Sequence, residues 1–152
     1  MATRNGSAEW RGDLQGGSGD LTVGDGVFSG QYSFASRFEE GEGTNPEELI
    51  AAAHAACFAM ALSHGLAEHG HAPDSVRATA KVHLRNIDGA PTIARIDLDV
   101  EGRVPGIDEA HFVEHAEEAK AACLVSRALA GVKQIERRNH EDSHTQGLKI
   151  PG

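Results

Sequence analysis

Two cysteines, Cys57 and Cys123, are the residues of this chain best suited to redox chemistry. Cys57 lies in a nearly uncharged run of small apolar residues between Leu49 and Leu66. A free cysteine, with a pKa of about 8.5, is only a few per cent thiolate at pH 7, so a nucleophilic thiol needs a nearby cation. In a water-poor pocket such a thiolate could cleave the O–O bond of a peroxide.

Arg37 is the leading candidate for the cation that would stabilise a Cys57 thiolate. Its neighbours Phe34 and Phe38 are apolar and would hold the guanidinium near a protein surface. Glu47 could orient the guanidinium through a bidentate ion pair. Glu47 and Cys57 are ten residues apart, which is about 15 Å along a continuous helix. We therefore expect either a broken helix or a homodimer in which Glu47 comes from a second subunit, and we favour the homodimer.

Cys123 is the other thiol that could act with Cys57. Attack on a peroxide would convert Cys57 to a sulfenic acid, which over-oxidises irreversibly unless a second thiol condenses with it. The resulting disulfide would need an external dithiol as reductant, and the cycle would use no metal or bound organic cofactor. Two cysteines are too few for a structural disulfide framework, which favours a transient pair in a reducing compartment.

The elements that must position these residues begin with short strands separated by glycine-rich turns. Strands are predicted around residues 8–11, 20–23 and 27–34, arranged as an antiparallel meander. Two further strands are predicted where apolar and polar residues alternate, from Val76 to Leu84 and from Ala94 to Val100. In the second of these we expect Ala94, Ile96, Leu98 and Val100 to face inward while Arg95, Asp97 and Asp99 face water. These patterns predict antiparallel sheets.

A long helix is predicted to start at Thr44-Asn45-Pro46-Glu47-Glu48. Thr44 and Asn45 are good N-caps, proline suits the first turn, and a capping box can pair Thr44 with Glu47 or Asn45 with Glu48. Apolar residues then go nearly all round the helix, which predicts burial on most sides. A single small domain has too few elements to cover such a helix, which also favours a homodimer.

A second helix is predicted after Val104-Pro105-Gly106, with Asp108 as its N-cap. Its apolar stripe ends at Cys123, and a further helical turn is expected over residues 124–130. A last strand would begin within residues 132–135. We expect one domain over residues 1–136, followed by a polar, flexible tail over residues 137–152.

Composition excludes several classes of function. The 152-residue chain has a formal net charge of -9, and its basic residues are scattered, which disfavours nucleic acid as a partner. The N-terminus does not resemble a signal peptide, and no run approaches the roughly 18 uninterrupted apolar residues of a membrane span. We therefore expect a cytoplasmic protein with no membrane partner.

The stretch from Arg37 to Ser63, which contains the Thr44-Asn45-Pro46-Glu47 helix start and Cys57, resembles the OsmC/Ohr family of thiol peroxidases. The likeness runs roughly from Trp10 to Ala130. The arginine shortly before the helix start and the sequence Val104-Pro105-Gly106-Ile107 favour the OsmC branch.

The resemblance implies an α/β (α+β) fold in which antiparallel sheets wrap around a buried central helix in an intertwined homodimer. It implies reduction of organic hydroperoxides, and more weakly of hydrogen peroxide, with lipoylated or other dithiols as reductants. Carried over residue by residue, Cys57 would be peroxidatic, Cys123 resolving, and Arg37 and Glu47 the activating pair. The chain departs from the family at Leu124, where proline is usual, and beyond residue 135, where the closing strand is poorly matched.

Other interpretations stay open beside this one. Without the resemblance, Cys57 would more often be a small core residue than a nucleophile. The chain could also be a non-catalytic redox sensor or a small-molecule-binding protein that uses the same apolar pocket. His54 and Cys57 share a helix face and could bind a metal, but a zinc site usually needs four ligands, so a neutral, packed or hydrogen-bonded His54 is favoured. Glu47 could act only as a helix-capping residue.

Overall fold

The computed structural model describes residues 2–132, 134–136, 138–139 and 146–151, with side chains up to residue 132. The chain divides into two compact units, residues 1–49 and residues 50–152. These units do not coincide with the expected domain over residues 1–136 and tail over residues 137–152.

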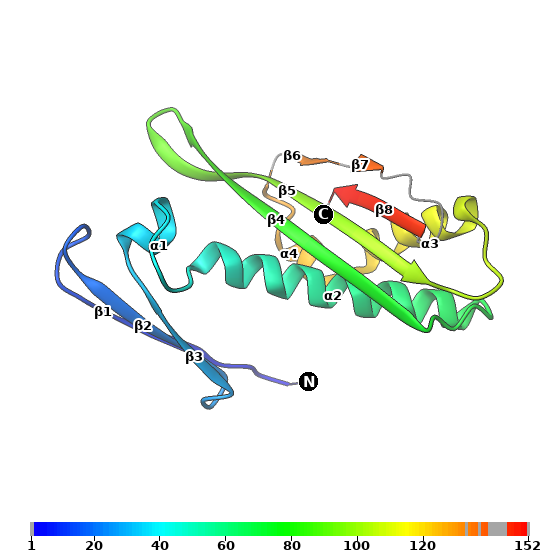
Figure 1. Cartoon of the computed structure of the whole chain (residues 1–152), viewed down its shortest axis with the longest axis horizontal. Coiled ribbons are helices and arrows are strands. Elements are labelled where there is room, and N and C mark those ends of the chain that lie inside the picture. The colour runs from blue at the N-terminus through cyan, green and yellow to red at the C-terminus, as the bar shows by residue number, and fades with distance from the viewer. Residues whose placement is uncertain (1, 133, 137, 140–145, 152) are drawn as a thin grey trace. The chain divides into compact units, whose positions relative to one another are not determined.

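The first unit contains a three-stranded antiparallel sheet in the order β1-β2-β3 (Figure 1). Its strands are β1 (Gly6–Arg11), β2 (Ser18–Val23) and β3 (Phe28–Tyr32), which confirms the predicted meander. The third strand is shorter than predicted, because Ser33 caps a short helix, α1 (Phe34–Phe38). The Ser33 hydroxyl accepts from the Ser36 N–H at 3.1 Å, and the Ser36 hydroxyl accepts from the Ser33 N–H at 2.8 Å. Five residues carry too little periodicity to reveal such a helix.

The long helix α2 (Pro46–Glu68) starts where the sequence predicts. Asn45 is its cap, because the Asn45 Oδ1 accepts from the Glu48 N–H at 2.8 Å. The Glu48 carboxylate accepts from the Thr44 hydroxyl at 2.8 Å instead of closing a capping box. Among the described residues, α2 is also the one helix long and apolar enough to cross a membrane, a property that it shares with long core helices.

The second unit contains the sheet β4-β5-β8-β7, with β6 beside β5 (Figure 1). β4 (Ser75–Ile87) and β5 (Ala90–Arg103) form a long antiparallel hairpin, which confirms the two alternating strands. Asp88 and Gly89 turn the hairpin with φ of 51° and 82°, the left-handed conformation of a type I′ turn.

The segment predicted as a flexible tail contains regular backbone structure in its described part. After β6 (Gln134–Glu136) come β7 (Arg138–Asn139) and β8 (Gln146–Pro151). β8 pairs antiparallel with β5 from Asp97 opposite Pro151 to Gly102 opposite Gln146. The alternating residues of β8, Gly-Leu-Lys-Ile, are few and follow a polar stretch, so the sequence pattern alone does not predict a strand there.

Helices α3 (Glu109–Ala122) and α4 (Leu124–Ala128) follow the hairpin. Asp108 caps α3 as predicted, since its carboxylate accepts from the His111 N–H at 2.9 Å. One cluster of buried side chains joins α2, β5 and α3 and extends to Cys123, so these helices cover one face of the sheet (Figure 1). The cluster comprises Phe58, Leu62, Leu66, Leu98, Val100, Phe112, Ala116, Ala119 and Cys123.

Asp97 was expected to face water, but its residue surface is only 6% exposed. Arg95 donates from Nε to one carboxylate oxygen at 2.7 Å, and the other oxygen lies 2.9 Å from the His83 Nε2. Burial opposes ionisation of this carboxyl, yet these hydrogen bonds outweigh it and hold the pKa of Asp97 below its ordinary value. Alternation alone could not show that two neighbours would cover and neutralise this charge.

Candidate active site

The Arg37 guanidinium and the Glu47 carboxylate form the bidentate ion pair that the sequence predicts. Arg37 Nε lies 3.0 and 3.2 Å from the two carboxylate oxygens, and Nη2 lies 2.8 Å from Oε1. The glutamate side chain is 8% exposed, while that of the arginine is 39% exposed. Glu47 lies in the first turn of α2 and Arg37 in the last turn of α1, so the pair fixes the guanidinium at the end of a short helix.

Backbone contacts hold α1 against the start of α2. Asn45 Nδ2 donates to the Ser36 carbonyl at 2.8 Å, and the Ser36 hydroxyl donates to the Thr44 carbonyl at 2.8 Å. Asn45 and Ser36 are both buried. Asn45, the cap of α2, and Ser36, a member of the capping box of α1, therefore also hold the two helices together where Arg37 and Glu47 meet.

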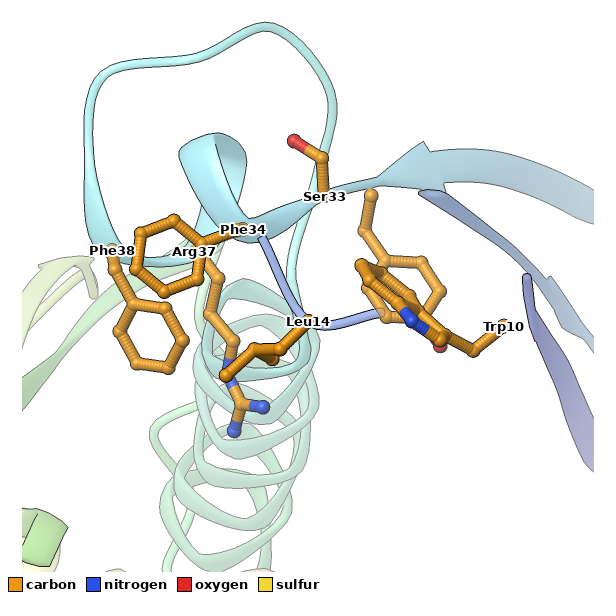
Figure 2. A pocket seen from close by; sticks show the side chains of 7 residues that line it. Trp10, Leu14, Ser33, Phe34, Arg37 and Phe38 are labelled. Carbon is orange, nitrogen blue, oxygen red and sulfur yellow. The ribbon is translucent and has the colours of Figure 1, made fainter. Parts of the chain in front are cut away.

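An apolar pocket of about 230 Å³ opens beside Arg37 in the first unit. In Figure 2 the arginine side chain passes Phe34 and Phe38 and ends close to Leu14. The guanidinium carbon lies 5.2 Å from the centre of the Phe38 ring. The lining is Trp10, Leu14, Tyr32, Ser33, Phe34, Arg37 and Phe38. The sequence pointed to the aromatic neighbours of Arg37 but not to Trp10 or Leu14, which the meander brings from a distant part of the chain.

The second unit brings Cys57 and Cys123 together. Cys57 lies on α2, half-buried against the core, and Cys123 lies between α3 and α4 with 1% of its surface exposed. Both thiols are free. Burial alone would raise the pKa of the Cys123 thiol, but hydrogen bonds from Ser126, Cys57 and the Val125 N–H lower it below its ordinary value. Cys57 and Cys123 thus lie in one packed cluster, as condensation into a disulfide requires.

His54 is packed and hydrogen-bonded, as the sequence analysis favours. It is fully buried, and its Nε2 lies 2.8 Å from the Ser126 hydroxyl. Burial lowers the pKa of the imidazole, so the neutral form prevails. Within the described residues no group of three or more His, Cys, Asp or Glu side chains is placed to hold a metal.

Ser126 is the site residue that the sequence analysis missed. It is buried, it lies three residues after Cys123, and its N–H donates to the Cys123 sulfur at 3.4 Å. The spacing of three at a helix start is the available signal, because a capping side chain accepts from the N–H three positions on. The predicted residues thus fall into two groups, Arg37 with Glu47 in the first unit and the cysteines in the second.

The sequence is similar to proteins with peroxide-related names. A family model described as OsmC-like protein matches residues 39–137. Peroxiredoxin OsmC of Escherichia coli strain K12 is 48% identical over 127 residues, which cover 83% of this chain and 89% of that protein. Organic hydroperoxide resistance protein OhrB of Bacillus subtilis strain 168 is 43% identical over 118 residues, 76% of this chain and 85% of the relative.

The fold is also similar to solved structures with related names. The structure of an organic hydroperoxide resistance protein OsmC from Legionella pneumophila superposes with a TM-score of 0.60 and 26% sequence identity. That alignment covers 87% of this chain and 93% of the Legionella chain. The mixed α/β architecture with antiparallel sheets is therefore shared along most of both chains.

Proposed function

Because this chain belongs to the OsmC family, we propose that it is a thiol-dependent peroxidase that reduces organic hydroperoxides by a two-cysteine mechanism. The names of its relatives, a peroxiredoxin and organic hydroperoxide resistance proteins, support a peroxidase-type role. The observation that carries the two-cysteine mechanism is that the free thiol of Cys57 packs against the buried cluster that contains the free thiol of Cys123.

In the first step the Cys57 thiolate attacks the outer oxygen of the hydroperoxide. A sulfur–oxygen bond forms, the O–O bond breaks, and the alkoxide leaves as the alcohol after taking up a proton. Cys57 becomes a sulfenic acid while the peroxide is reduced. Arg37, held by Glu47, supplies the positive charge that stabilises the thiolate and the departing alkoxide.

In the second step the Cys123 thiolate attacks the sulfur of the Cys57 sulfenic acid. A sulfur–sulfur bond forms, the sulfur–oxygen bond breaks, and hydroxide leaves and is protonated to water. The Cys57–Cys123 disulfide is then reduced by an external dithiol, for which a lipoyl-type dithiol is our candidate. The cycle uses no metal and no bound organic cofactor.

The pocket beside Arg37 supports an organic hydroperoxide over hydrogen peroxide as the preferred substrate. Its lining is mainly aromatic and aliphatic, and its polar groups belong to Arg37, Ser33, Tyr32 and Trp10. Burying an alkyl or aryl group there gains hydrophobic free energy that hydrogen peroxide cannot supply. Hydrogen peroxide would therefore react more weakly.

The active form is proposed to be a homodimer. α2 is continuous from Pro46 to Glu68, so the helix break that would bring Glu47 toward the Cys57 of its own chain is not observed. α2 also exposes apolar surface in the single chain: Met60 is 76% exposed, and Ala52, Ala53 and Ala56 are exposed. A second subunit would cover this face and could supply the Arg37–Glu47 pair.

The proposal is tested by following cumene hydroperoxide consumption with dihydrolipoamide as reductant. Cys57→Ser is expected to abolish turnover, and Cys123→Ser to stop after one equivalent with a trapped sulfenate or an over-oxidised sulfur. Turnover that survives Cys57→Ser would sink the proposal. Wild-type consumption of one equivalent only, with no dithiol-driven turnover, would point to the redox sensor. The dithiol requirement also fits our expectation of a cytoplasmic location.

A further inference from the structure

A buried chain of polar groups runs through the second unit from His54 to the two cysteines. The His54 Nε2 lies 2.8 Å from the Ser126 hydroxyl. Ser126 in turn donates its N–H to the Cys123 sulfur at 3.4 Å, and the side chains of Ser126 and Cys57 are among the groups that lower the pKa of the Cys123 thiol. His54, Cys123 and Ser126 are all buried.

The direction of the hydrogen bonds follows from the chemistry of the sulfur. A thiolate can only accept, so a Ser126 hydroxyl that faces the Cys123 thiolate must donate its single proton to sulfur. The hydroxyl oxygen can then only accept from His54, which requires the Nε2–H tautomer of the neutral imidazole. The His54 Nδ1 is buried with no hydrogen-bond partner among the described residues, and in this tautomer it carries a lone pair and not an unpaired N–H.

We propose that Ser126 and His54 are positioning residues for the resolving cysteine, with His54 fixing the buried Ser126 side chain and Ser126 orienting the Cys123 sulfur toward Cys57. This inference rests on the proposed function, in which the Cys123 thiolate displaces hydroxide from the Cys57 sulfenic acid. His54 remains neutral and takes up no proton during the step. Its N–H donates to the Ser126 hydroxyl oxygen, so that the hydroxyl hydrogen is left to point toward the Cys123 sulfur.

The groups that bear on the Cys123 sulfur come from two elements. α2 contributes the His54 imidazole, through Ser126, and the Cys57 thiol. α4 contributes the Ser126 hydroxyl and N–H and the Val125 N–H. The members of the core cluster that α3 and β5 contribute are apolar. A lowered pKa of the Cys123 thiol agrees with this arrangement, in which the Ser126 side chain and the N–H groups of Val125 and Ser126 face the sulfur.

The test measures the ionisation of Cys123 directly, in a Cys57→Ser background that keeps a hydroxyl donor at that position. Thiolate absorbance in the ultraviolet is followed against pH, with no peroxide and no turnover. Ser126→Ala is expected to raise the midpoint by about one pH unit, since it removes one hydrogen bond to a charged group. Ser126→Thr keeps the hydroxyl and is expected to leave the midpoint near that of the parent.

His54 is tested with a matched pair of variants. His54→Gln keeps an N–H donor near the Nε2 position, whereas His54→Leu removes it, so only the second should raise the midpoint. In a Ser126→Ala background His54→Leu should add nothing, because the histidine acts through the hydroxyl. An unchanged midpoint in Ser126→Ala, with only the melting temperature lowered, would overturn the proposal in favour of a structural hydrogen bond. If the midpoint shifts of His54→Leu and Ser126→Ala were instead additive in the double variant, the role assigned to His54 would be wrong.

Two further readouts keep the inference testable if a variant does not fold. In wild-type protein above the pH at which Cys123 ionises, the ¹⁵N chemical shifts of His54 should report a protonated Nε2 and an unprotonated Nδ1. The opposite tautomer would contradict the proposed series of hydrogen bonds. In single turnover with cumene hydroperoxide, Ser126→Ala should prolong the sulfenate and shift the pH profile of disulfide formation upward by the same amount as the titration. The titration tests the role of Ser126 and His54 without peroxide, so a protein with no peroxidase activity could still show the expected midpoint shifts. Failure of the proposed function and failure of this inference are therefore distinguishable.

Discussion

The replacement of Leu124 by proline is predicted to stabilise the protein. The OsmC/Ohr resemblance implies proline directly after the resolving cysteine, and this chain has leucine there. Leu124 is the first residue of α4, a position whose N–H needs no intrahelical acceptor and whose φ suits proline. Cys123 before it has φ −62° and ψ 121°, an extended conformation that is allowed before proline. The backbone around residue 124 is therefore already in a conformation that proline tolerates.

The expected magnitude follows from what is gained and what is lost. Leu124 is 67% exposed, so removing its side chain sacrifices little buried apolar surface. Proline at a compatible position restricts the unfolded chain and stabilises the folded state by roughly 0.4–1 kcal/mol. For a chain of this size that corresponds to a rise of about 1–4 °C in melting temperature. The stiffer turn should also shorten the lifetime of the Cys57 sulfenate, since Cys123 would be held more firmly.

Thermal unfolding followed by circular dichroism measures the first effect, and trapping of the sulfenate at increasing delays measures the second. Leu124→Ala is the matched control, because it removes the same side chain without adding the ring. A Leu124→Pro protein that melts below Leu124→Ala would refute the reasoning, since it would mean that the backbone at this position opposes proline. A sulfenate lifetime equal in both variants would show that the rigidity of the turn does not limit resolution.

Three other changes have expected outcomes. Asp97→Asn should destabilise the fold by roughly 1–3 kcal/mol at pH 7, because it weakens the charged hydrogen bond that the half-buried Arg95 donates to this carboxylate at 2.7 Å. Since the pKa of Asp97 is lowered in the folded state, that contribution exists above the unfolded pKa of about 3.9 and is lost as the pH falls through the folded value. Denaturant unfolding should therefore show wild type and variant converging at acid pH, and a constant difference would contradict the argument. Gly102→Ala should cost about 1–3 kcal/mol in the same assay, because the new methyl group would meet the ring of the fully buried Phe112; unchanged stability would mean that the ring can move aside. Glu47→Gln should slow sulfenate formation with cumene hydroperoxide, because its arginine partner loses a bidentate acceptor, and an unchanged rate would remove that pair from the activation of the thiol.

Local sequence patterns predicted most of the elements. The helix start at Thr44-Asn45-Pro46, the cap at Asp108 and the turn at Asp88-Gly89 depend on interactions between residues close in the chain, so the sequence contains all the information needed. The alternating strands β4 and β5 follow from the same kind of local rule. The pairing of Arg37 with Glu47 could also be predicted from the sequence, because the two residues flank a short connection.

Long-range contacts explain what the sequence pattern missed. β8 adds to β5 from a stretch whose own alternation is short, and its strand character depends on a partner edge far back in the chain. Asp97 belongs to an alternating strand that reads as solvent-facing, yet Arg95 and His83 cover it. The helix α1 depends on two serines that cap each other over five residues, too few for a periodic signal.

The sequence by itself determined which residues could perform thiol chemistry, since cysteine, arginine and glutamate have fixed chemical properties wherever they lie. It also determined where most helices and strands begin, because caps and turns are local. Only the tertiary structure decided that Cys123 meets Cys57 and that Ser126, 72 positions after His54, joins the imidazole to the Cys123 sulfur. The physical reason is that a hydrogen bond between distant residues forms only after the packing of α2 against the C-terminal helices has brought them together, and no local pattern encodes that distance.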